Sequence, residues 1–460
     1  MLNLKHVANL KAMIGEENVS SDKAHTLAYS YDATRNEYEP DAVVFPRDEA
    51  DVSKILKYCN DNRIVIVPRG AGSGFTGGAL PANGGIILAF EKHMNKILEI
   101  DMENLVARVQ PGVVNMEFQK AVEALGLFYP PDPASQDYST LGGNVSENAG
   151  GMRAAKYGIT KDYVMALRAV LPNGDVIRAG KKTIKDVAGY NIAGILIASE
   201  GTLAVLTEIT LKLIPKPKMQ RTVMGIFPSV DAAMNATYKT FAAGVSPVAM
   251  EFLDNLTIQS VEKIYKKGLP LDAGAILIAD VDGNTDADLA FQLGALEKVF
   301  KENGSIGFKK AETPEEAADI WFARRNASPS LKAYGPTKLN EDITVPRSKL
   351  PELLKRIDAI GKEYDHVIPC FGHTGDGNVH VNVMTDKNDP VRYLNAEKAI
   401  HAIFEAAVDL EGTLSGEHGI GLSKAPFMTM AFSPEEMNLF RTLKHAFDPN
   451  NILNPNKMGL

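Results

Sequence analysis

The chain has 460 residues and a net charge of −8, a length that predicts two or three domains. It lacks a Lys/Arg-rich stripe with interleaved aromatic residues, which argues against nucleic-acid binding. Its two cysteines, Cys59 and Cys370, are too few for a disulfide framework or for an iron–sulfur cluster, which needs about four thiolates. The N-terminus resembles an amphipathic helix rather than a signal peptide, and no apolar run approaches the roughly 20 residues that span a bilayer. We therefore expect a cytoplasmic protein, with contact to the inner face of the membrane only through a partner.

The first half of the chain alternates helical and extended patterns. Residues 48–62 carry an apolar stripe at helical spacing, and residues 64–67 form a short apolar run typical of a buried strand. Further strands are expected at residues 86–88, 162–171, 176–178 and 209–213. The run Pro-Lys-Pro-Lys at 215–218 breaks regular structure and is the predicted domain boundary. In the second half, a buried strand is expected at residues 275–281 and a helix at residues 286–303.

The predicted strand at 64–67 leads directly into the richest glycine cluster of the chain, residues 68–78. Gly72, Gly74 and Gly77 match the spacing of the Rossmann dinucleotide fingerprint, so an NAD site has to be considered. A Rossmann turn must open a helix, whereas this cluster leads through more Pro and Gly into another strand. We interpret the cluster as a phosphate-binding loop between two strands, in which backbone amides bind the anion; a simple tight turn is the alternative.

A second segment rich in Gly, Asn and Ser spans residues 139–151 and follows the proline-rich run 130–133. It supplies hydroxyls and free backbone amides but almost no apolar surface, so packing does not explain it. We interpret it as a second ligand-binding loop, with a long surface loop as the alternative.

Two histidines seven residues apart flank a glycine-rich turn, and an acid–base pair follows about forty residues later. Val379, Val381 and Val383 alternate with His380, Asn382 and Met384, so a strand here would bury the valines and point His380 the other way. The intervening glycines let the chain fold back, which would bring His373 beside His380. Two imidazoles and a carboxylate are a common ligand set for a catalytic metal, because three protein ligands leave a position open for substrate. We therefore predict that His373, His380 and Glu417 bind a metal and that His418 is a catalytic base; histidines satisfied on a tight turn are the alternative.

The glycine-rich segments and the run Ser-Glu-Gly-Thr at 199–202 have the order and separations of the vanillyl-alcohol-oxidase type flavoproteins. The histidine constellation is similar to their D-2-hydroxyacid dehydrogenase branch, which includes the flavoprotein subunits of glycolate oxidases, D-lactate dehydrogenases and D-2-hydroxyglutarate dehydrogenases. The resemblance implies an α+β fold with a two-subdomain FAD-binding domain over residues 1–217. It also implies a ferredoxin-like antiparallel-sheet cap domain over residues 218–420 and a C-terminal segment, 421–460, that returns to the FAD domain.

The resemblance also implies which residues hold FAD. The loop after the first predicted strand contains no histidine or cysteine that could attach the flavin, so we expect dissociable, non-covalent FAD. The expected FAD contacts are Pro68, Arg69, Gly70, Ala71, Gly72, Ser73, Gly74, Gly77, Gly78, Pro131, Ser139, Gly142, Gly143, Asn144, Ser146, Asn148, Gly150, Gly151, Glu200, Gly201 and Lys457.

Three further side chains are expected to contact the substrate. Arg324 matches the arginine that grips the substrate carboxylate, a role that suits a guanidinium because it pairs bidentately and keeps its charge when desolvated. Asn382 matches a second substrate contact, and His418 would contact the substrate as the base. The D-2-hydroxyglutarate members carry a lysine where this chain has Asn340, and Lys338 is displaced from that position by two residues. This departure favours a small monocarboxylate such as D-lactate or glycolate.

The function implied is oxidation of a small D-2-hydroxy acid to the 2-oxo acid with hydride transfer to FAD. Zinc is the expected metal, with iron and manganese as alternatives. Because the chain has no motif for a second redox centre, electrons would pass to an iron–sulfur partner subunit, an electron-transferring flavoprotein or a quinone. Direct reaction with oxygen, a D-2-hydroxyglutarate dehydrogenase and a non-catalytic flavin-binding subunit of a glycolate oxidase complex remain alternatives. A homodimer is compatible with the sequence.

Overall fold

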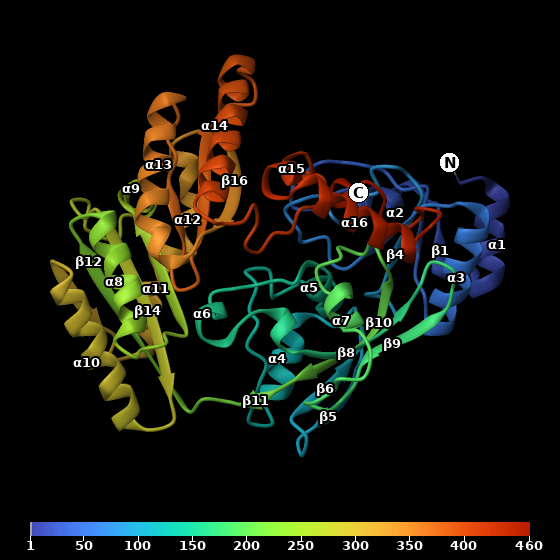
Figure 1. The fold of residues 1–460 in the computed structure, drawn as a ribbon, viewed down its shortest axis with the longest axis horizontal. Helices are drawn as coiled ribbons and strands as arrows, with labels where there is room; N and C mark the ends of the chain where they lie inside the picture. Colours follow the sequence, from blue (N-terminus) through green and yellow to red (C-terminus); the bar gives the residue numbers. More distant parts are fainter. Residues whose placement is uncertain (1) are drawn as a thin grey trace. The chain divides into compact units, whose positions relative to one another are not determined.

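The structure is a computed structural model that describes residues 2–460. The chain divides into two compact units, each with its own sheets and core (Figure 1). The first unit comprises Met1–Gly150, Ile159–Lys216 and Glu417–Leu460, and the second comprises Gly151–Gly158 and Pro217–Gly416. No helix among residues 2–460 combines the length and the apolar character needed to cross a membrane.

The first unit contains a four-stranded sheet in the order β1–β2–β4–β3. Its strands are β1 (Val19–Ser20), β2 (Ala42–Val44), β3 (Ile66–Arg69) and β4 (Ile86–Ala89). Strand β4 pairs in parallel with both β2 and β3. The helices α1 (Leu4–Ile14) and α3 (Glu49–Asn62) contribute apolar side chains to the core of this sheet. Helix α3 confirms the helix predicted over 48–62, with Asp48 as its N-cap.

Parallel strands are usually joined by a helix, but β3 and β4 are joined by the glycine-rich segment 70–85, which contains no helix. The structure thus confirms that the cluster is a loop between two strands, and the Rossmann interpretation is wrong. Strand β3 begins two residues later than the sequence predicted. It extends into the predicted loop because Pro68 and Arg69 pair with Leu88 and Ala89 of β4.

A second sheet in the first unit has five antiparallel strands in the order β5–β6–β10–β8–β9. They are β5 (Ile97–Asp101), β6 (Val106–Val109), β8 (Val164–Val170), β9 (Val176–Gly180) and β10 (Val205–Lys212). The core of this sheet includes residues of α4 (Asn115–Glu123), α5 (Leu141–Glu147) and α7 (Ile192–Leu196). Also in this unit are α2 (Lys23–Ala28), α15 (Met428–Ala431), α16 (Pro434–Phe447) and the two-stranded pair β7 (Leu127–Phe128) and β11 (Ile214–Pro215). Near the C-terminus, Leu453 bridges to Ile66 of β3, so the end of the chain packs into the core of the first sheet.

The second unit is built on one seven-stranded antiparallel sheet in the order β15–β12–β14–β13–β17–β18–β16. Its strands are β12 (Met219–Phe227), β13 (Ala249–Asp254), β14 (Ala275–Gly283), β15 (Gly307–Lys310), β16 (Thr337–Thr344), β17 (Cys370–His373) and β18 (Asn378–Thr385). Its helices are α6 (Ala154–Tyr157), α8 (Val230–Ala242), α9 (Asn255–Tyr265), α10 (Asp286–Glu302), α11 (Pro314–Arg325), α12 (Ala327–Ser330), α13 (Leu350–Glu363) and α14 (Pro390–Asp409) (Figure 1).

The centre of this sheet is buried on both faces. Every residue of β14 is buried, and Ile276 and Ile278 share one core cluster with residues of α9 and α11. The strand predicted at 275–281 and the helix predicted at 286–303 are confirmed by β14 and α10. This antiparallel sheet with its helices is the arrangement expected of the cap domain, and the α+β fold class is confirmed.

Candidate functional site

A pocket in the first unit collects most of the residues expected to contact FAD. The expected residues that line it are Pro68, Arg69, Gly70, Ala71, Gly72, Ser73, Gly74, Gly78, Ser139, Gly142, Gly143, Asn144, Ser146, Gly150, Glu200 and Gly201. The expected residues that do not line it are Gly77, Pro131, Asn148, Gly151 and Lys457. The two glycine-rich segments thus meet in one pocket although about sixty residues of sequence separate them.

Several pocket residues were not identified from the sequence. Two aromatic side chains, Phe75 and Tyr138, line the pocket and remain about half exposed. Because aromatic rings pack well against flat ligands, both suit a flavin or adenine ring. An aromatic residue inside an otherwise small and polar loop was the available signal. The other residues missed are Ala79, Phe90, Pro111, Pro133, Ala134, Ser135, Thr140, Glu147, Ala149, Ala204 and Leu206.

Two cations expected to contact FAD are buried and hydrogen-bonded to the protein itself. Arg69 donates from Nη2 to Tyr31 O at 2.7 Å, and its guanidinium lies over the ring of Tyr29. Lys457 donates from Nζ to Leu80 O at 2.7 Å, and burial lowers its pKa to about 8. Both therefore hold the shape of the loops around the pocket, and a cofactor contact by either stays a prediction.

The two predicted metal-binding histidines lie side by side in the second unit. His373 ends β17 and His380 lies on β18, and the two strands form a hairpin. The turn requires Gly377, which has φ +91° and where a Cβ would clash with Val345 O. The Nε2 atoms of the two histidines lie 3.2 Å apart, which confirms that the glycine turn brings them together. Both faces of β18 are buried, so His380 and Asn382 are enclosed like the valines opposite them.

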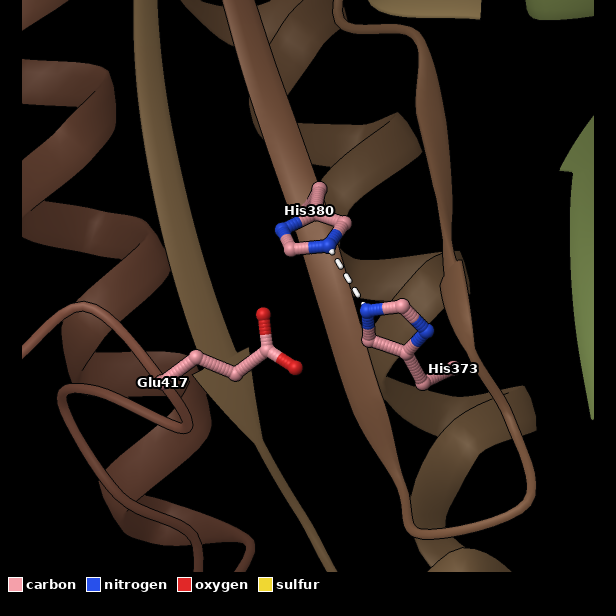
Figure 2. Close-up of side chains that lie close together, drawn as sticks. All are labelled: His373, His380 and Glu417. Carbon is pink, nitrogen blue, oxygen red and sulfur yellow. Dashed lines mark hydrogen bonds between the residues drawn. The ribbon is translucent and has the colours of Figure 1, made fainter. Parts of the chain in front are cut away.

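The donor set fits a divalent metal. Two imidazole nitrogens bound tetrahedrally to zinc at about 2.0–2.1 Å would lie about 3.3 Å apart, close to the observed separation. His373, His380 and Glu417 each offer a ligand atom, and these atoms lie within 4.8 Å of one another (Figure 2). Glu417 directly follows Gly416, whose N–H donates to Asp342 Oδ2 of strand β16 at 3.0 Å.

The most informative residue that the sequence did not reveal is Glu251, on β13. Its side chain is fully buried, and its two oxygens accept from His373 Nδ1 and from Arg324 Nε, each at 2.6 Å. Burial alone would raise the pKa of Glu251, but its interactions with His373 and Arg324 outweigh burial and hold the pKa below its usual value. A proton on His373 Nδ1 leaves Nε2 as the nitrogen that can bind a metal. The only sequence signal was a single acid in an apolar strand.

The guanidinium of Arg324, the predicted carboxylate anchor, is only partly used by the protein. It lies in the last turn of α11, its side chain is 12% exposed, and its guanidinium carbon lies 4.9 Å from the centre of the Phe371 ring. Glu251 occupies Nε only, and among residues 2–460 no hydrogen bond uses the two Nη groups. These two groups form the end of the guanidinium that pairs bidentately with a carboxylate. The neighbouring Arg325 is exposed and donates to Ala318 O in its own helix.

Asn382 is fully buried, and its amide is already hydrogen-bonded within the sheet. Its Nδ2 donates to Pro369 O and His380 O, each at 3.1 Å, and its oxygen accepts from Asn340 Nδ2 at 2.8 Å. These bonds suit a residue that holds β18 in place, and a direct substrate contact stays a prediction. Lys338 is exposed and donates to Ser328 Oγ.

The carboxyl groups of Glu147 and Glu200 are buried near the pocket that the glycine-rich segments form. A Cβ at Gly78 would lie 2.8 Å from Glu147 Oε1 and 3.8 Å from Glu200 Oε2. Burial raises the pKa of Glu200 as well, but its carboxylate accepts two backbone N–H groups, which favour the ionised form and oppose this rise. Glu147 Oε2, in contrast, has no hydrogen-bond partner among the described residues. Burial and the nearby charge of Glu200 raise the pKa of Glu147 well above its usual value. We therefore assign the proton of this pair to Glu147.

Replacing Glu147 by Gln is expected to stabilise the protein at neutral and alkaline pH. A carboxyl whose pKa is raised by folding stabilises the native state only while it is protonated. This stability is lost as pH rises from about 4.5, the unfolded value, through the folded pKa. The variant cannot ionise, so its free energy of unfolding at pH 8 should exceed the wild-type value by at least about 1 kcal/mol and match it near pH 4.

Urea unfolding of both proteins across this pH range, with FAD content matched, measures the difference. The matched control is Glu103→Gln, at an exposed turn, which should leave the pH dependence unchanged. Parallel pH curves for wild type and the Glu147 variant would contradict the protonation assigned to Glu147.

The sequence matches known protein families in both halves of the chain. The family of the FAD binding domain matches residues 40–180, and the C-terminal domain of FAD linked oxidases matches residues 216–458. Glycolate oxidase subunit GlcD of Bacillus subtilis (strain 168) is 45% identical, over 96% of this chain and 94% of that protein. D-lactate dehydrogenase of Anaerostipes hadrus is 34% identical, over 99% of this chain and 96% of that protein.

The fold is shared with solved flavoproteins. The structure of p-cresol methylhydroxylase with substrate bound matches this one with a TM-score of 0.81 at 19% identity, over 99% of this chain and 96% of that chain. This likeness confirms a fold of the vanillyl-alcohol-oxidase type. The chain belongs to the FAD-linked oxidases, the family of flavin-dependent oxidoreductases that includes glycolate oxidase subunit GlcD and D-lactate dehydrogenase.

Proposed function

We propose that this protein oxidises a small D-2-hydroxy acid, D-lactate or glycolate, to the 2-oxo acid with FAD and a divalent metal, zinc in the first instance. The observation that carries the proposal is Glu251, which binds His373 with one oxygen and Arg324 with the other. One buried carboxylate thereby fixes the distance between a predicted metal ligand and a predicted carboxylate anchor. A 2-hydroxy acid carries its hydroxyl and its carboxylate on neighbouring carbon atoms, so the spacing of these two groups is fixed as well.

Each predicted site residue has its own role in the proposed reaction. His373, His380 and Glu417 would hold the metal, which supplies Lewis acidity that lowers the pKa of the substrate hydroxyl. Arg324 would bind the substrate carboxylate through its Nη groups and orient the acid. An imidazole nitrogen of His418 would take the hydroxyl proton as the carbon-bound hydrogen leaves as hydride. FAD held in the pocket of the first unit supplies the hydride acceptor.

The environment of Asn340 supports a small substrate. The D-2-hydroxyglutarate members resembled by this sequence carry a lysine at this position, whereas here the side chain of Asn340 is bonded to Asn382. Lys338 is exposed and bonded to Ser328, so it does not substitute for that lysine. A dicarboxylate would therefore lack a cation for its second carboxylate, which favours a monocarboxylate.

Reduced FAD would pass its electrons to an external acceptor. Both cysteines are buried and free, and their positions offer no cluster ligation within residues 2–460. An iron–sulfur partner subunit, an electron-transferring flavoprotein and a quinone all suit this requirement, and the relative named as an oxidase subunit favours a partner subunit. We further propose that the protein acts in the cytoplasm, at the membrane only through such a partner.

Steady-state assays of the FAD-loaded protein with a panel of 2-hydroxy acids and an artificial acceptor dye test the proposal. D-lactate or glycolate should be oxidised in preference to D-2-hydroxyglutarate and to the L-acids. Dialysis against a chelator should abolish turnover while the flavin spectrum persists, and added zinc should restore turnover. Full activity in metal-free protein would refute the metal's role. Inactivity on the whole panel with metal and FAD bound would favour a non-catalytic flavin-binding subunit.

A further inference from the structure

The segment that carries the proposed base is attached to the rest of the first unit at several consecutive residues. His418 is followed by Gly-Ile-Gly and then by Leu422 and Ser423. Two residues far away in sequence, Thr76 and Glu200, make the attachments.

Glu200 binds the segment with both carboxylate oxygens. Its Oε1 accepts from the N–H of Ile420 and its Oε2 from the N–H of Gly421, each at 2.7 Å. Glu200 is 5% exposed and has φ +49°, a left-handed conformation that a non-glycine residue adopts only when its surroundings hold it there. Buried, charge-assisted bonds to two successive amides resist movement of the backbone that they hold.

Thr76 binds the same segment on both sides of those amides. Its hydroxyl donates to His418 O at 3.1 Å, and its own carbonyl accepts from the N–H groups of Leu422 at 2.7 Å and Ser423 at 3.0 Å. Thr76 is buried, and the neighbouring ring of Phe75 lies 5.0 Å from the ring of His418. Phe75 lines the pocket of the glycine-rich loops, so the loop that shapes that pocket also holds His418.

Two glycines allow this close approach. A Cβ at Gly419 would clash with Glu147 Oε2 and lie 3.1 Å from Glu200 Oε1, and a Cβ at Gly421 would clash with Thr76 O. Both glycines also have positive φ, +79° and +51°. The Gly-Ile-Gly sequence after His418 is therefore explained by what its backbone touches.

We propose that Glu200 and Thr76 are positioning residues that fix the backbone of residues 418–423 and thereby aim the imidazole of His418. The inference rests on the proposed function, in which His418 is the base. Its physical basis is that a base contributes to catalysis only when it is held within hydrogen-bond reach of the proton it takes. Glu200 also lines the pocket of the glycine-rich loops, and the contact with FAD expected of it stays a prediction.

The test combines kinetics with hydrogen exchange on FAD-loaded protein. Thr76→Val keeps the shape of the side chain but removes the donor to His418 O, and Thr76→Ser restores the donor. Glu200→Gln keeps the size but turns an amide N–H₂ toward one of the two backbone N–H groups. Both Thr76→Val and Glu200→Gln should lower kcat at least about tenfold, while KM stays within about twofold of the wild-type value. Both should also shift the pH profile of kcat. The kcat of Thr76→Ser should stay within about twofold of wild type.

Hydrogen exchange provides a measurement that does not depend on turnover. In Glu200→Gln the amides of Ile420 and Gly421 should exchange at least about tenfold faster than in wild type, with FAD content unchanged. Unchanged exchange, or kcat values within twofold of wild type, would overturn the proposal. Loss of FAD from Thr76→Val with unchanged exchange would also overturn it, because Thr76 would then serve the cofactor. If wild type oxidises no acid, the proposed function fails, and the exchange result still decides whether Glu200 holds the segment.

Discussion

Replacing Glu251 by Gln is expected to weaken metal binding and to destabilise the protein. The amide offers one acceptor to the two donors that now share the carboxylate, and it leaves the charge of Arg324 buried without its counter-ion. Removing one partner of a buried ion pair typically costs about 3–5 kcal/mol. Losing the carboxylate behind a metal-binding histidine typically lowers metal affinity about 10–100-fold.

Two measurements separate these effects. Zinc titration of metal-free protein gives the affinity, and urea unfolding of the metal-free protein gives the stability without the contribution of bound metal. Glu297→Gln is the matched control, because Glu297 pairs with Lys301 on the exposed face of α10 and such pairs contribute only about 0–1 kcal/mol. A Glu251 variant that behaves like this control in both measurements would remove the observation on which the proposed function depends.

The parts of the fold that the sequence predicts best are those set by local pattern. The apolar stripe over 48–62 is helix α3, and the apolar run at 275–281 lies within β14. The glycine-rich turn between His373 and His380 brings the imidazoles together because a two-stranded hairpin needs no information from elsewhere in the chain. In each case the relevant spacing lies within a few residues, where side-chain periodicity and turn chemistry apply directly.

The parts that the sequence did not reveal depend on contacts between distant residues. Glu251 lies 122 positions from His373, and Thr76 lies 342 positions from His418. No periodic pattern links such pairs, so only the folded sheet and loops bring them together. A buried acid in a strand is, by sequence alone, an unexplained residue.

The sequence also did not predict the direction in which polar side chains point. Lys457 and Asn382 were both expected to contact a ligand, but their polar atoms form hydrogen bonds within the protein. Lys457 donates to Leu80 O. Asn382 donates to Pro369 O and His380 O and accepts from Asn340. The Gly/Asn/Ser-rich run 139–151 was interpreted as a loop, and this is wrong for Leu141–Glu147, which form helix α5. The side chain of Thr140 caps this helix by accepting from the N–H of Gly143. Composition identifies residues that can bind a ligand, but backbone geometry decides which of them turn toward it.

His418→Ala and Glu417→Ala are expected to abolish turnover for different reasons. Removing a general base typically lowers the rate about 10²–10⁴-fold, so His418→Ala should lose at least two orders of magnitude in kcat while keeping both metal and FAD. Glu417→Ala removes one of the three predicted ligands, so it should lose the metal itself and recover no activity at zinc concentrations that saturate wild type.

Three measurements on a single preparation of each variant distinguish the two: metal content after gel filtration, flavin absorbance and kcat. Glu397→Ala, at an exposed position of α14, is the control and should leave all three values unchanged. If His418→Ala retained wild-type kcat, the base would have to be another group and the attachment of residues 418–423 would have no catalytic purpose. If Glu417→Ala kept its metal, the two histidines would need a different third ligand, and Figure 2 would show a chance approach of the carboxylate. The expected pattern, with turnover lost from both variants but metal lost only from Glu417→Ala, would assign two adjacent residues to two separate functions.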